Sequence, residues 1–192
     1  FTGTALKLYS FLERVTNRDD AWGESFGYNN YSFTNLGRSL TALERVFHID
    51  FHKPVATSYK EYIWAGLIKA RRYFYWGDSS GGSHLRNGNN WLWLLAKTRD
   101  PLLAWYCDHL KQGETWEDVL FADAAIPRKD PFGESPSRLF RSVGTTVFKG
   151  GWEPTDFSFA MRSGAFFNHQ HLDQGAFWLA DRGTIFLEER DG

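Results

Sequence analysis

The chain has little of what marks several specialised classes of protein. Its 192 residues include one cysteine, Cys107, and 22 basic residues stand against 23 acidic ones. A single cysteine cannot form an internal disulfide, so this is not a disulfide-stabilised scaffold. Without a run of like charge to hold a phosphate backbone, nucleic acid is not expected as a partner. No apolar stretch approaches the roughly 20 residues that span a bilayer, so we expect no membrane span.

Aromatic residues are abundant instead. The chain contains 17 Phe, 9 Trp and 8 Tyr, together 18% of its residues. Aromatic side chains dominate core energetics, and Trp and Tyr also offer flat faces with a polar tip, which suits sugars. The tryptophan count therefore hints at a carbohydrate ligand. The first residues are neither a start methionine nor a signal peptide, so we expect a fragment of a longer chain.

Helical spacing of apolar residues prevails up to about residue 135. Leu8, Phe11, Leu12 and Val15 fall on one helical face, and Asp100-Pro101 is typical of a helix start. A capping box is expected at Ser58 and Glu61. The pattern predicts helices over 8–15, over 35–47 behind an Asn35 cap, over 58–68 and over 100–110, with shorter ones over 90–97 and 115–121.

After Pro136 the period becomes two, as in β-strands. Alternation runs over 143–148 and 157–162, and Asp181-Arg182-Gly183 divides the apolar stretch 175–189 into a hairpin. Helices followed by strands without interleaving predict an α+β chain with a helical part, 1–135, and an antiparallel β part, 136–192.

The segment from Asn168 to Asp173 is the strongest candidate for chemistry. In an extended segment, His169, His171 and Asp173 lie on one side, about 6.5 Å apart along the chain. Two imidazoles and a carboxylate suit zinc, with the carboxylate as a ligand or as the group that orients a ring. Alternatively, one histidine is a ligand and the other a general acid or base. Two surface histidines with a loop Asp would look the same.

The same segment carries a family resemblance. His169-x-His171-x-Asp173-x-x-x-Phe177, with Leu179 and Gly183 behind it, resembles the signature of heparinase II/III-like polysaccharide lyases. Further landmarks similar to that family are Leu139-Phe140, Val143-Gly144, Gly151-Trp152, 157–163, Trp22-Gly23-Glu24, Tyr28, Tyr31 and Gly77-Asp78-Ser79. The resemblance implies that 1–135 is the C-terminal part of an (α/α) toroid. It implies that 136–192 holds the first strands of an antiparallel β-sandwich.

The resemblance also implies a reaction, the cleavage of a uronic-acid-containing polysaccharide by β-elimination. The C5 proton of a uronate is barely acidic, so the carboxylate must be neutralised, a base must take the proton and an acid must protonate the leaving oxygen. His169 matches the catalytic histidine of the family. Tyr75, with Tyr73 as the alternative, matches its tyrosine, and Asn30 is the candidate for neutralising the carboxylate. Substrate contacts are expected from Tyr28, Asn29, Glu24 and Trp76.

A structural zinc ion is implied in addition. His171 matches the family's ligand histidine, and Glu189 lies where a second ligand is expected, with Glu188 and Asp191 as competitors. A further histidine would have to come from beyond Gly192. Asp173 fits better as the group that orients a histidine than as a ligand.

Two other functions remain open at this stage. A glycoside hydrolase on a helical toroid would need two facing carboxylic acids, for which Glu24, Asp78 and Glu114 are available without a marked pair. A non-catalytic carbohydrate-binding protein of the same fold would keep affinity without turnover. An acidic polysaccharide as partner points to a periplasmic or secreted protein.

Overall fold

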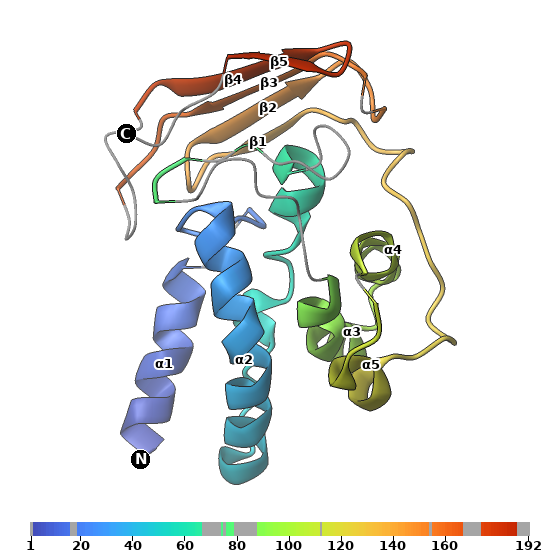
Figure 1. Cartoon of the computed structure of the whole chain (residues 1–192). Helices are drawn as coiled ribbons and strands as arrows, with labels where there is room; N and C mark the ends of the chain where they lie inside the picture. The colour runs from blue at the N-terminus through green and yellow to red at the C-terminus, as the bar shows by residue number, and fades with distance from the viewer. Residues whose placement is uncertain are drawn as a thin grey trace.

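The computed structural model describes residues 2–15, 19–66, 74, 76–78, 88–111, 113–153, 155–166 and 174–187. Helices form one layer and a sheet lies across one end of them (Figure 1). The helices are α1 (Thr2–Val15), α2 (Phe26–Phe47), α3 (Leu92–Thr98), α4 (Pro101–Leu110) and α5 (Trp116–Phe121), with short turns η1 (Lys53–Val55), η2 (Tyr62–Gly66) and η3 (Gly88–Trp91). The strands are β1 (Arg138–Phe140), β2 (Thr145–Lys149), β3 (Ser158–Arg162), β4 (Ala176–Asp181) and β5 (Thr184–Leu187).

Aromatic rings form the centre of the helical layer. Phe33 of α2 stacks on Trp91 of η3 with 3.8 Å between ring centroids, and Tyr62 and Tyr106 meet Trp91 edge-on. These residues are almost completely buried. Offset and edge-to-face pairs of this kind add about 0.5–1.5 kcal/mol each beyond the burial of their area. Many of the aromatic residues in this sequence therefore serve core packing.

The fourth predicted helix begins where the sequence indicates. The Asp100 carboxylate accepts the backbone N–H groups of Leu102 at 2.8 Å and Leu103 at 3.5 Å, and Pro101 occupies the first helical position. The same carboxylate accepts the hydroxyl of buried Tyr59 at 2.6 Å. Burial, and then this hydrogen bond, raise the pKa of Tyr59 above its ordinary value, so the phenol remains a donor.

Asp100→Ala is therefore expected to lower the free energy of unfolding by about 2–3 kcal/mol, because a helix cap is lost and a buried hydroxyl loses its acceptor. Asp100→Asn keeps an acceptor for the cap and should lose only about half as much. Urea unfolding midpoints measure both. Equal losses in the two variants would contradict the role of Asp100 as a cap.

Two other helical predictions were wrong in detail. Helix α2 begins at Phe26, well before the predicted Asn35 cap, because Phe26 and Phe33 are drawn into the aromatic core. The predicted capping box at Ser58 does not form. The Ser58 hydroxyl donates to the carbonyl of Val55 at 3.0 Å, and Glu61 bonds elsewhere. A turn and the π-helical η2 stand there instead.

The strands confirm the antiparallel prediction. They form one five-stranded sheet in the order β1-β2-β3-β4-β5, and all neighbours are antiparallel. Arg182 and Gly183, both with positive φ, join β4 to β5. Positive φ at both central residues is the geometry that suits the right-handed twist of a hairpin, so the predicted turn is correct. The described residues support a helical part and an antiparallel sheet, whereas the assignment of these parts to a segment of an (α/α) toroid and to the first strands of a β-sandwich remains a prediction.

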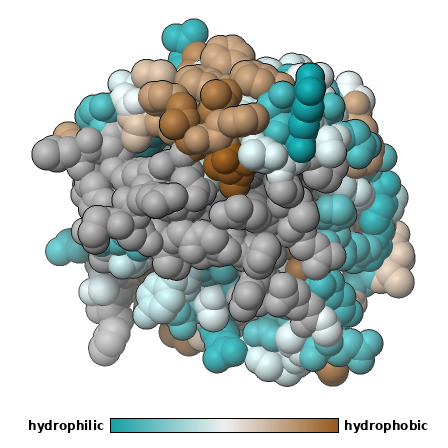
Figure 2. Space-filling model, turned by 45° about the horizontal axis from the view of Figure 1, so that its top comes forward, coloured by the Kyte–Doolittle hydropathy of each residue, from teal (hydrophilic) through white to brown (hydrophobic). Residues whose placement is uncertain are grey.

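The two faces of the sheet differ sharply. The face toward the helices is buried and includes Phe140, Val147, Ala160, Trp178 and Arg162. Trp178 meets Phe74 of the helical layer edge-on at 5.6 Å. The outer face exposes apolar side chains, namely Leu139, Phe148, Met161, Phe177, Phe186 and Leu187. Figure 2 shows brown and tan side chains gathered near the top of the molecule, where Figure 1 places the sheet.

No helix in the described part of the chain is long and apolar enough to cross a bilayer.

Candidate functional site

The segment before α2 is held by the sheet on one side and the helices on the other. The Asp19 carboxylate accepts the backbone N–H of Ser142 at 2.8 Å and also its hydroxyl. Asp20 lies 3.5 Å from the guanidinium of Arg138 and 3.7 Å from the ammonium of Lys60. Residues 19–25 therefore fix where α2 begins beneath the sheet.

A chain of hydrogen bonds continues from the core to Glu24. The buried Glu61 carboxylate accepts the backbone N–H of Trp22 at 3.1 Å. The indole N–H of Trp22 donates to the Glu24 carboxylate at 3.3 Å. Glu24 is half-buried, so its position is set by Trp22 while part of its surface stays accessible.

Glu61 and Arg162 are ionisable side chains that are buried where the layers meet. Glu61 is 3% exposed and Arg162 of β3 is 2% exposed. Burial raises the pKa of Glu61 to about 8, and the Trp22 N–H and the Arg162 charge act against this rise. The Arg162 guanidinium also lies over the Trp76 ring, 5.7 Å from its centroid. Trp76 is itself buried and packs 5.3 Å from Phe26.

The adjacent Asn29 and Asn30 face different environments. The buried stripe of α2 consists of Phe26, Asn29, Phe33, Gly37 and Leu40. Asn29 has no solvent exposure, and among the described residues neither atom of its side-chain amide has a hydrogen-bond partner. Such a group costs about 1–3 kcal/mol and calls for a functional or structural explanation. Asn30 is half-buried, so a ligand can reach it more directly.

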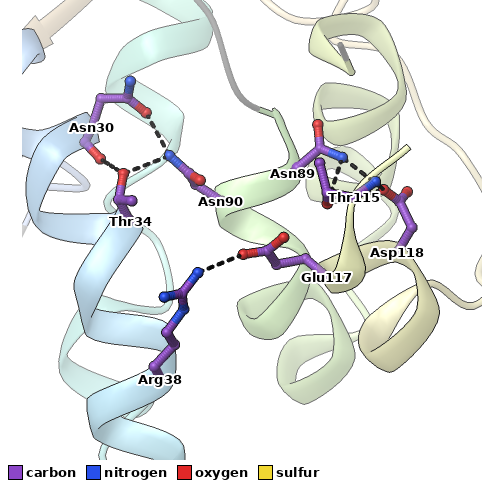
Figure 3. Close-up of polar contacts among 8 residues, drawn as sticks. All are labelled: Asn30, Thr34, Arg38, Asn89, Asn90, Thr115, Glu117 and Asp118. Atoms are coloured by element: carbon purple, nitrogen blue, oxygen red, sulfur yellow. Dashed lines mark hydrogen bonds and ion pairs between the residues drawn. The ribbon is translucent and has the colours of Figure 1, made fainter. Parts of the chain in front are cut away.

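Asn30 belongs to a polar contact between α2 and η3, drawn in Figure 3. The Asn90 side-chain nitrogen lies 3.4 Å from the Asn30 side-chain oxygen and 2.8 Å from the Thr34 hydroxyl oxygen. Thr34 in turn donates to the Asn30 backbone carbonyl at 2.9 Å. The oxygen end of the Asn30 amide faces Asn90, and Figure 3 shows its nitrogen on the other side of the group.

The predicted site is thus described only in part. Glu24, Tyr28, Asn29 and Asn30 come together at the start of α2, with Trp76 against Phe26. His169, His171, Asp173, Tyr73, Tyr75, Glu188, Glu189 and Asp191 lie outside the described residues. Their roles, and the zinc site that needs His171 and Glu189, remain predictions. Among the residues that the structure describes, no cluster of three or more His, Cys, Asp or Glu side chains could hold a metal ion.

Glu61, Arg162 and Asn90 were not identified from the sequence. Glu61 looked like half of a local capping box, and Arg162 alternates with aromatic residues as an outward-facing strand residue would. The contact of Glu61 with Trp22 joins residues 39 positions apart, and the contact of Asn90 with Asn30 joins residues 60 positions apart. Asn90, two residues after a glycine, carried no local sign of a long-range role.

Comparison with known proteins identifies the fold. No protein-family model and no curated protein matches the sequence. Among solved structures, heparinase III matches with 17% identity and a TM-score of 0.69 over 94% of this chain. Another heparinase III matches with 14% identity and a TM-score of 0.66 over 96% of it. Heparan sulfate lyase HepC from Pedobacter heparinus matches with 16% identity and a TM-score of 0.63 over 94% of it.

These likenesses show a heparinase-like fold, which confirms the resemblance seen in the sequence at the level of the fold. The chain spans 29%, 28% and 27% of the three matched chains, respectively. It therefore corresponds to less than a third of each.

Proposed function

We propose that the chain is part of a polysaccharide lyase that cleaves a uronic-acid-containing polymer by β-elimination. In this reaction a base removes the C5 proton, a double bond forms between C4 and C5, the C4–O bond breaks, and an acid protonates the leaving oxygen. His169 and Tyr75 are the proposed acid and base. Negative charge develops on the uronate carboxylate as the proton leaves, so donors aimed at it lower the barrier.

The observation that supports this proposal best is the orientation of Asn30. Its amide oxygen faces the Asn90 side-chain nitrogen at 3.4 Å, which directs its own N–H groups away from Asn90. A carboxylate accepts hydrogen bonds and cannot donate them, so the nitrogen end is the one that the reaction requires. Asn30 is half-buried on a heparinase-like fold, a position in which a polymer can reach it.

The test is to incubate the full-length protein with alginate, heparan sulfate and chondroitin and to record absorbance near the ultraviolet band of unsaturated uronates. We expect a rise on at least one of these polymers. No rise on any uronate polymer would defeat the proposal. New reducing ends without the absorbance would indicate a glycoside hydrolase, and binding without either product a carbohydrate-binding protein.

Two variants test the assigned roles. Loss of a general acid or base typically reduces the rate about 10²–10⁴-fold, and we expect this for His169→Ala. Loss of a preorganised donor costs about 10²–10³-fold in kcat, as expected for Asn30→Ala. Asn35→Ala is the matched control, because this exposed amide on the same helix donates to the Tyr31 carbonyl at 3.2 Å and to nothing else in the described part of the chain. An Asn30→Ala variant as active as Asn35→Ala would contradict the role of Asn30.

The proposed function includes a structural zinc ion and export from the cytoplasm. A structural zinc held by His171 and Glu189 would stabilise the segment that carries His169, and no step of the reaction is assigned to it. We propose a periplasmic or secreted location, because uronate polymers of this kind occur outside the cytoplasm.

A further inference from the structure

We propose that Asn90 and Thr34 are positioning residues that hold the Asn30 amide with its N–H groups toward the substrate. The inference rests on the proposed function for its catalytic consequence. Its structural content, a fixed orientation of one amide, stands on the contacts between α2 and η3 (Figure 3).

The backbone around Asn90 is held by its neighbours. A Cβ on Gly88 would lie 2.4 Å from the Cys107 carbonyl oxygen, so only glycine allows η3 to approach α4 this closely. The Asn89 side chain donates to Asp118 at 2.7 Å and to Thr115 at 3.2 Å, at the start of α5. Trp91 is buried against Phe33. With both sides anchored, the Asn90 side chain extends toward α2 from a rigid support, as preorganised sites require.

The hydrogen bond that Thr34 donates determines which group is donor and which is acceptor in the other two contacts among Thr34, Asn90 and Asn30. The Thr34 hydroxyl uses its only hydrogen on the Asn30 backbone carbonyl, at 2.9 Å, so toward Asn90 it can only accept. Asn90 must therefore present its NH₂ end to Thr34, at 2.8 Å. The second hydrogen of that NH₂ group points to Asn30, which must present its oxygen, at 3.4 Å.

This fixed orientation determines which end of the Asn30 amide is offered to the substrate. The two ends of a side-chain amide have nearly the same shape and differ only as donor and acceptor. A reversed Asn30 would offer an oxygen to the uronate carboxylate, and two acceptors repel. Thr34 and Asn90 thus select the donor end without touching the substrate.

The experiment compares paired variants of the full-length protein on the uronate polymer that gives the largest ultraviolet signal. Asn90→Asp replaces a donor by an acceptor and should draw the NH₂ end of Asn30 toward itself. We expect Asn90→Asp to lower kcat/KM about tenfold more than Asn90→Ala does, because Asn90→Ala leaves the Asn30 amide without a preferred orientation. The loss should lie in kcat more than in KM, because the charge on the carboxylate develops in the transition state.

Thr34 provides a conservative rescue. Thr34→Val keeps the shape and removes the hydroxyl, so kcat should fall, whereas Thr34→Ser keeps the hydroxyl and should retain it. Asn35→Ala remains the control on the same helix. Equal effects of Asn90→Asp and Asn90→Ala, or of Thr34→Val and Thr34→Ser, would overturn the proposal, because a purely structural role does not distinguish the members of each pair.

A second measurement does not depend on turnover. The side-chain NH₂ resonances of Asn30, assigned by their loss in Asn30→Ala, should shift in Asn90→Asp and Thr34→Val and stay in place in Thr34→Ser. If the wild-type protein cleaves no uronate polymer, the proposed function fails, and these resonances still decide the orientation of Asn30. Unshifted resonances in both Asn90→Asp and Thr34→Val would overturn it.

Discussion

Gly144→Ala is expected to destabilise the protein by about 3 kcal/mol or more. Gly144 ends the turn between β1 and β2 with a φ of +67°. A Cβ there would lie 2.1 Å from the Ser163 carbonyl oxygen and 2.4 Å from the Gly164 Cα. Backbone atoms cannot move aside as a flexible side chain can, and the left-handed conformation adds about 1–2 kcal/mol of its own.

A second glycine, Gly175, allows the conformational cost of a positive φ to be measured apart from the cost of the steric clash. Gly175 has a φ of +86°, but a Cβ there would meet nothing within 4 Å. Gly175→Ala should therefore show the conformational cost alone, and exposed Gly133→Ala, with open space and no positive φ, should show neither. Urea unfolding gives the three values. A Gly144→Ala variant no less stable than Gly175→Ala would mean that the turn does not approach β3 as described.

Glu61→Gln should remove a large pH dependence of stability. Burial raises the pKa of Glu61 from 4.5 to about 8. An unfolded chain releases this proton near 4.5, so the folded state binds more protons between these values, and its stability falls as the pH rises from about 4.5 to about 8. At 1.36 kcal/mol per pKa unit, the effect amounts to at most about 5 kcal/mol. The contribution is fully present below pH 4.5 and is lost at about pH 8.

Glutamine keeps an acceptor for the Trp22 N–H and cannot ionise, so the variant should gain stability over the wild type as the pH increases. Glu13→Gln, at an exposed position of α1, is the control and should follow the wild type. Unfolding curves at pH 5, 6.5 and 8 measure the difference. Parallel pH profiles for Glu61→Gln and wild type would show that Glu61 is not held in a desolvated position.

Features decided by neighbouring residues could be predicted from the sequence. The Asp100 cap, the short helix α5 and the Arg182-Gly183 turn depend on residues within a few positions of each other. The start of α2 could not be predicted in this way. Gly27 and the two asparagines are weak helix formers, and packing of Phe26 and Phe33 overrides their preference.

In the candidate site, too, the local pattern could be predicted from the sequence and the long-range contacts could not. The sequence pointed to Asn29 and Asn30 together, since paired asparagines have identical chemistry. Their different burial arises from the 3.6-residue period of α2 and from where the core lies, which only the fold reveals. The orientation of Asn30 depends on Asn90, sixty positions away, and no local pattern predicts such a contact.

The contacts of Asp19 and Asp20 determine how the protein responds to the salt concentration. Asp19 and Asp20 reach Ser142, Arg138 and Lys60 through charged, partly solvated contacts, whereas each layer is internally held by apolar packing. Added electrolyte, with a Debye length of about 8 Å at physiological ionic strength and about 3 Å at 1 M, weakens the first kind of contact and not the second. Added salt should therefore weaken the contacts of Asp20 with Arg138 and Lys60, while the apolar contacts between the layers, such as that of Trp178 with Phe74, persist.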